Sequence, residues 1–233
     1  MKVVKINFNE KNIAQNPLKS FDRYSEKVLD IVKRNSKVDR TTFVSELKVL
    51  GDVFEKKNEK TLMNKKTKKL AETLVSLKNQ DLAGIVYSFL VKFNKGDDKL
   101  VEEFATNALA IAVRLKDYVH IQARAGNLKE LYKRKEYGSD KHLNAIYQQK
   151  KALNEVIRSY DSVKQNQRTI KTEMKPIENY EASLAAVKLE IAELIMAKDK
   201  NSAKAELLDA QAIYKKLGVG KNSQRIEELL KQL

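Results

Sequence analysis

The chain has 233 residues, a formal net charge of +15, no cysteine, 7 glycines and 2 prolines. The absence of cysteine excludes disulfides, thiolate metal sites and cysteine nucleophiles. Because glycine and proline interrupt helices, their scarcity beside abundant lysine, leucine, alanine and glutamate predicts a nearly all-α protein. No apolar run is long enough to span a bilayer, and the first residues do not resemble a secretory signal. We therefore expect a cytoplasmic protein without a membrane span.

The first segment, residues 1–16, has apolar residues at every second position: Val4, Ile6 and Phe8. This spacing is compatible with a short strand, but a single strand would have no partner. We therefore expect residues 1–16 to form a flexible tail.

Helical spacing of apolar residues begins at Pro17. It predicts an N-terminal helical segment, 17–78, which is either a degenerate repeat or a cap. Asp39 or Thr41 is suited to cap its second helix, which has a buried face from Phe43 to Phe54. The helices predicted in the first half of the chain are 18–35, a helix that follows Asp39 or Thr41, 60–78 and 80–94. The helix at 80–94 is apolar over most of its surface, which predicts neighbours on several sides.

The second half predicts further helices with short connections, so neighbouring helices are expected to be antiparallel. Asp97 or Asp98 is suited to cap the first of these helices. Pro176 breaks the helical chain after the longest predicted helix. The predicted ranges are 98–116, 118–135, 140–170, 177–198, 201–217 and 221–233.

A stretch of alternating small and large residues recurs in these helices. The sequence NALAIAVRLKD (107–117) aligns with DAQAIYKKLGV (209–219) at an offset of 102 residues, which is three times 34. The alignment places Ala108 over Ala210, and a weaker copy at 151–161 places Ala152 over Ala108. Paired helices with a period of 34 are typical of the tetratricopeptide repeat (TPR), and this part of the chain resembles that family in a divergent form.

The family pattern has small residues nine and sixteen positions after a large residue of the first helix. Ala203 and Ala210 follow Leu194 at these spacings, whereas the family's tryptophan, first-helix glycine and closing proline are missing. Ala145 and Ala152 follow Tyr132 in the same way if residues 137–140 are looped out. The resemblance implies that residues 79–233 are stacked antiparallel helix hairpins that form a right-handed α-solenoid.

The resemblance also implies a function. Proteins of this kind hold a peptide or a partner helix in a concave groove lined by the first helices. Because the corresponding residues are more basic than acidic, we expect a scaffold or adaptor with an acidic or carboxylate-terminated protein partner. The oligomeric state is left open. The expected groove residues are Asn127, Glu130, Lys133, Lys188, Arg225 and Gln232.

A lysine cluster supports an alternative function. Residues 56–69 contain seven lysines and one glutamate, a charge that attracts nucleic acid or another polyanion. The cluster has no arginine and no interleaved aromatic residue, which favours a solvated helix face over a binding site. Its members are Lys56, Lys57, Lys60, Lys65, Lys66, Lys68 and Lys69.

The sequence contains no recognisable catalytic pattern. The two histidines, His120 and His142, lie near helix starts and have no histidine or acidic partner at the spacing of a metal site. We interpret both as surface or partly buried residues. No phosphate-binding glycine loop or serine elbow is present. We expect a protein that is not an enzyme and that has no metal ion or cofactor.

Overall fold

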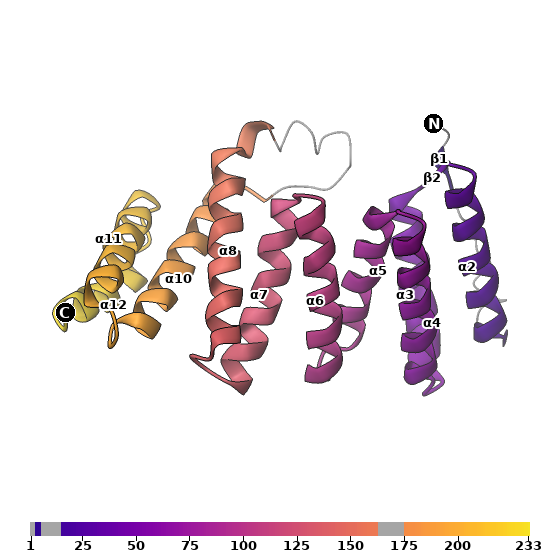
Figure 1. Cartoon of the computed structure of the whole chain (residues 1–233), viewed down its shortest axis with the longest axis horizontal. Helices are drawn as coiled ribbons and strands as arrows, with labels where there is room; N and C mark the ends of the chain where they lie inside the picture. The colour runs from indigo at the N-terminus through magenta and orange to yellow at the C-terminus, as the bar shows by residue number, and fades with distance from the viewer. Residues whose placement is uncertain (1–2, 6–14, 163–174) are drawn as a thin grey trace. The chain divides into compact units, whose positions relative to one another are not determined.

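The structure, a computed structural model, describes residues 3–5, 15–162 and 175–233 of the chain (Figure 1). Within these residues the fold is mostly helical, and consecutive helices pack against each other in a repeat-like array. The all-α prediction is confirmed. The chain divides into two compact units: unit 1 is Met1–Leu115 and unit 2 is Lys116–Leu233. Whether the helices before residue 79 are a degenerate repeat or a cap remains a prediction.

Unit 1 is built around its most apolar helix, α5, which contacts α3, α4 and α6. The buried residues of α5 include Leu82, Val86 and Leu90, and three helices of unit 1 pack against α5. This arrangement agrees with the sequence, which predicted neighbours on several sides. The helices of unit 1 are α2 (Pro17–Lys33), α3 (Arg40–Lys56), α4 (Lys60–Ser76), α5 (Gln80–Phe93) and α6 (Asp98–Arg114).

The turn between α4 and α5 is short because one residue reverses the chain and the following residue caps the next helix. Lys78 has a left-handed backbone with φ of 58°. Beside it, the Asn79 amide donates to the Leu74 carbonyl at 2.9 Å, and the Asn79 side chain accepts from Leu82 N at 3.3 Å. Asp39 and Asp97 cap α3 and α6, as the sequence allowed.

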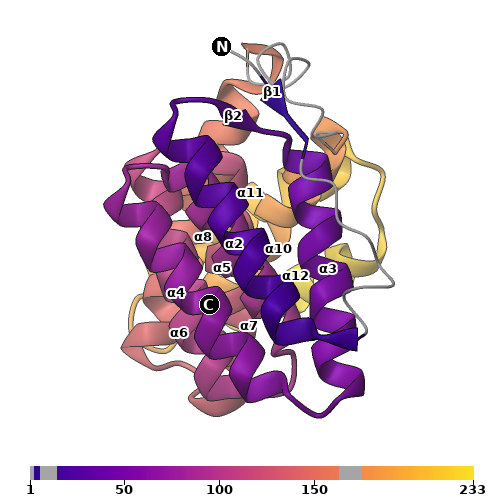
Figure 2. The ribbon, with the colours of Figure 1, turned by 90° about the vertical axis from the view of Figure 1, so that its right-hand side faces the viewer.

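A short strand at the N-terminus was expected to have no partner, but the structure shows one. The strand β1 (Val3–Val4) pairs in parallel with β2 (Lys37–Val38), which connects α2 and α3 (Figure 2). The Asp39 amide donates to the Val4 carbonyl at 2.9 Å and extends the pairing. The partner is separated from β1 by the whole of α2, so local spacing did not reveal it. Residues 1–2 and 6–14 of the expected tail lie outside the described residues.

The core of unit 1 contains two polar contacts. The Tyr24 ring stacks on Phe43, and the Tyr24 hydroxyl donates to the Phe43 carbonyl at 3.0 Å. Asn64 of α4 and Asn94, which follows α5, exchange two side-chain hydrogen bonds of 2.7 and 2.8 Å while both are buried. Because an unpaired buried amide is costly, this reciprocal pair fixes how α4 sits against the end of α5.

Unit 2 contains two extensively packed helix pairs, α7 with α8 and α10 with α11. Helix α8 also contacts α10, and α12 packs on α11. The single long helix predicted at 140–170 differs from the structure, in which α8 ends at Arg158 and Ser159 is its C-cap. Residues 163–170 lie outside the described residues. The helices of unit 2 are α7 (Tyr118–Lys135), α8 (Asp140–Arg158), α10 (Ile177–Ile195), α11 (Lys200–Lys216) and α12 (Lys221–Leu230).

The small residues that carried the repeat pattern are buried. Ala108 lies on α6, Ala152 on α8 and Ala210 on α11, with exposed fractions of 3%, 1% and 0%. Each of these helices is the second helix of a pair, after α5, α7 and α10 respectively. The residues that carry the repeat pattern in the sequence are therefore buried residues on the second helices of packed pairs.

In the part of the chain that the structure describes, no helix combines the length and the apolar character that crossing a membrane requires.

Candidate functional site

The predicted groove residues all lie in unit 2. Asn127, Glu130 and Lys133 are on α7, Lys188 is on α10 and Arg225 is on α12. Gln232 follows the end of α12 and is exposed. Their surroundings differ, and these surroundings decide which of the side chains are accessible at the surface.

Lys188 is buried, with 8% of its surface exposed. Its ammonium lies 2.7 Å from Asp209 Oδ2 and 3.2 Å from Glu206 Oε2, both on α11. Lys150 of α8 pairs with the other oxygen of Glu206. Burial lowers the pKa of Lys188, but the hydrogen bonds to Asp209 and Glu206 outweigh it and raise the pKa overall. The four side chains thus form a charge network, Lys150–Glu206–Lys188–Asp209, that joins α8, α10 and α11.

Lys133 also has an internal partner. Its ammonium lies 2.8 Å from Glu190 Oε1, while Lys129 lies 3.0 Å from Glu190 Oε2. Glu190 is buried on α10, and burial alone would raise its pKa. The hydrogen bonds from Lys133 and Lys129 outweigh that effect and lower the Glu190 pKa. This contact joins α7 to α10, and the Lys133 side chain remains 46% exposed.

The remaining predicted residues are more accessible. Arg225 donates from Nε to Glu193 Oε1 at 3.1 Å and keeps about half of its side chain exposed. Glu130 is exposed and pairs with Lys129 at 2.9 Å. Asn127 is half-buried. The accessible members of the predicted set are therefore Glu130, Lys133, Arg225 and Gln232.

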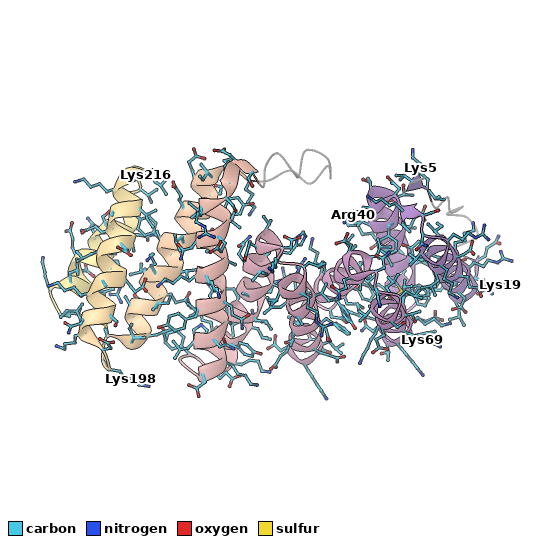
Figure 3. The ribbon with its side chains drawn as sticks, turned by 45° about the horizontal axis from the view of Figure 1, so that its top comes forward. Lys5, Lys19, Arg40, Lys69, Lys198 and Lys216 are labelled. Carbon is cyan, nitrogen blue, oxygen red and sulfur yellow. The ribbon has the colours of Figure 1, made fainter. Side chains whose placement is uncertain are left out.

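The lysine cluster of unit 1 separates into two groups. Lys66 pairs with Asp22 of α2, Lys68 pairs with Glu103 of α6, and Lys60 lies over the ring of Phe93. The other four cluster members are exposed and have no carboxylate partner among the described residues. Figure 3 shows one of them, Lys69, on the opposite side of unit 1 from Arg40. The four exposed lysines are Lys56, Lys57, Lys65 and Lys69.

The two histidines have different surroundings. His120 Nδ1 lies 2.7 Å from Asp117 Oδ2, and the His120 side chain is 45% exposed. His142 is 0% exposed, deeper than its position at a helix start suggested. In the described ranges, no group of three or more histidine, aspartate or glutamate side chains is arranged to hold a metal ion.

No protein-family model and no curated protein sequence matches the chain. A solved structure with some similarity is the crystal structure of BtubC (BKLC) from P. vanneervenii, at 12% sequence identity and a TM-score of 0.44. The match covers 94% of this chain and 90% of that one. A score of this size does not establish a common fold. The packing of consecutive helices by itself defines the class of the protein, a helical-repeat-like protein.

Proposed function

We propose that the chain is a non-enzymatic interaction protein whose helix pairs are TPR-like hairpins, stacked with a right-handed superhelical sense. A peptide or helix of a partner protein would lie across the first helices, α7 and α10, and across α12. One observation carries the proposal: Ala108, Ala152 and Ala210 each occupy a buried place on the second helix of a pair. Small residues at that place allow the paired helices to approach closely, which is the packing that the repeat requires.

The charges at the accessible residues favour an acidic partner. Lys133 and Arg225 each contact one carboxylate of α10 and keep about half of their side chains exposed. A carboxylate of the partner can add a charge-assisted hydrogen bond to the exposed donors. Lys188 has little exposed surface, so we propose that it holds α10 and α11 together instead of contacting the partner.

The proposal can be tested with an array of acidic peptides that end either in a free carboxylate or in an amide. Replacing Arg225 and Gln232 by alanine should lower the affinity for the peptides that bind about tenfold, because a hydrogen bond to a charged group contributes about 1.5–3 kcal/mol. Lys204→Ala is the matched control, since Lys204 is exposed on the second helix α11. Binding of no acidic peptide, or an equal loss in the Lys204 variant, would contradict the proposal.

The exposed lysines of unit 1 support a second candidate function, the binding of nucleic acid or another polyanion. Lys56, Lys57, Lys65 and Lys69 lack carboxylate partners among the described residues, so their charge is available to phosphate groups. Lys66 and Lys68 contribute less to such binding, because Asp22 and Glu103 already neutralise them.

A further inference from the structure

The buried imidazole of His142 holds the turn between α7 and α8. Its Nδ1 accepts a hydrogen bond from the Gly138 amide at 3.1 Å. Gly138 has φ of 78°, a left-handed conformation that suits glycine. The Tyr137 ring lies 5.3 Å from the imidazole, centroid to centroid. The histidine thus contacts two successive residues of the turn, Tyr137 and Gly138.

The hydrogen bond from the Gly138 amide determines the tautomer of the neutral imidazole. Because Nδ1 accepts, a neutral ring carries its proton on Nε2. Nε2 faces Glu190 Oε1 of α10 at 3.6 Å, which is longer than a hydrogen bond. The charged groups around the ring are Glu190 from α10 and Lys129, Glu130 and Lys133 from α7.

We propose that His142 is an acid-sensitive latch: protonation of its imidazole releases the Gly138 amide and loosens the α7–α8 turn. An imidazolium donates from both nitrogens, so Nδ1–H would face the N–H of Gly138, donor against donor. The Nε2–H has Glu190 as its acceptor and is drawn toward it. The turn would therefore lose the contact that closes it, while the contact of α8 with α10 is strengthened.

The direction of the pH effect follows from burial. Burial lowers the pKa of His142 below its usual 6.5; Glu190 opposes this shift, whereas Lys133 and Lys129 support it. The unfolded chain therefore takes up the proton more readily than the folded chain does. The free energy of unfolding should fall as the pH drops below about 6.5. The contribution of Glu190, whose pKa is lowered from 4.5, is lost only at more acidic pH.

The experiment follows the Gly138 amide and the His142 ring by NMR in the full chain, from about pH 8 to about pH 5. We expect the Gly138 resonance to shift with the same midpoint as the His142 ring. Hydrogen exchange at Gly138, corrected for its intrinsic pH dependence, should accelerate about tenfold below that midpoint. A Gly138 amide that does not respond while His142 titrates, or a His142 that stays neutral throughout, would overturn the proposal.

Two variants distinguish the latch from general acid loosening. His142→Asn keeps an acceptor near the position of Nδ1 and cannot be protonated, so Gly138 should lose its pH dependence. His120→Asn removes the other of the two histidines and should leave the Gly138 titration unchanged. If the Gly138 amide of the His142→Asn variant shows the same pH dependence as in the unmodified chain, the latch does not exist. The measurement on the unmodified chain decides the question even if His142→Asn folds poorly.

Discussion

The buried alanines on the second helices of the pairs do more than favour helix formation. Ala203 and Ala210 are both fully buried and belong to one core cluster with Ala185 and Ala192 of α10. Small side chains on both helices bring the two backbones close, and larger neighbours such as Leu207 and Tyr214 fill the space beside them. At such a position there is no room for a longer side chain.

This close approach predicts a sharp difference between two alanines of the same helix. Ala210→Leu should destabilise the protein by about 1–3 kcal/mol, because added methyl groups force α10 and α11 apart. Ala212→Leu should change stability by less than about 0.5 kcal/mol, because Ala212 is exposed. Urea unfolding followed by circular dichroism measures both. Equal effects of the two substitutions would contradict the packing described for Ala210.

At the scale of elements, the turns explain how a helical chain manages with 7 glycines. Asn35, Asn58 and Lys78 all have positive φ and follow helices α2, α3 and α4. Asparagine tolerates this conformation better than lysine does, since its short polar side chain can bond locally. Lys78 therefore occupies a position at which glycine would be less strained.

We expect Lys78→Gly to stabilise the protein. Relief of the left-handed conformation gains about 1–2 kcal/mol, and the extra freedom of glycine in the unfolded chain costs about 0.5–1 kcal/mol. Lys57→Gly is the matched control, because Lys57 is the C-cap residue after α3, has φ of −92° and therefore has no such strain. Thermal unfolding should therefore show a raised midpoint for Lys78→Gly and a lowered one for Lys57→Gly. A lowered midpoint for both would mean that the turn at Lys78 is not strained.

The elements were predictable from the sequence, whereas their contacts were not. Most helix ends lie within three residues of the predicted ones, because apolar periodicity and capping residues are local signals. The partners of Lys133 and Lys188 are distant in sequence, Glu190 and Asp209, and a single sequence gives no sign of them. The burial of His142 was missed for the same reason: its neighbours come from α7 and α10.

At the scale of the whole molecule, the charge of +15 attracts polyanions wherever lysines are exposed. Affinity for a polyanion could therefore have two different causes, general attraction by the net charge or binding at the lysine cluster. They separate only when two variants lose the same charge at different places.

We expect replacement of Lys56, Lys57, Lys65 and Lys69 by alanine to weaken binding of a single-stranded DNA of about 20 nucleotides. The salt dependence of the affinity should also become weaker, because each lost phosphate contact reduces the magnitude of the slope of log K against log salt by about 0.7. Fluorescence anisotropy at several salt concentrations measures both quantities. The matched control replaces four exposed lysines of unit 2: Lys198, Lys200, Lys204 and Lys215.

The control variant should keep most of the slope, although its net charge falls by the same amount. Lys198 precedes α11 and the other three control lysines lie along α11, so the control charges are spread over one helix of the other unit. Figure 3 shows Lys198 near the start of that helix and Lys216 at its end. Equal losses in the two variants would assign the affinity to net charge alone. No binding at low salt would remove the second candidate function.

The reciprocal hydrogen bonds of Asn64 and Asn94 have a consequence for how this sequence can evolve. Each amide supplies the other's donor and acceptor, and Asn94 also donates to the Leu90 carbonyl. Replacing one of them leaves the other buried and unsatisfied, whereas replacing both by apolar residues of similar shape can be nearly neutral. Natural variants of this sequence should therefore keep both asparagines or exchange both together, and lineages with a single exchange should be rare.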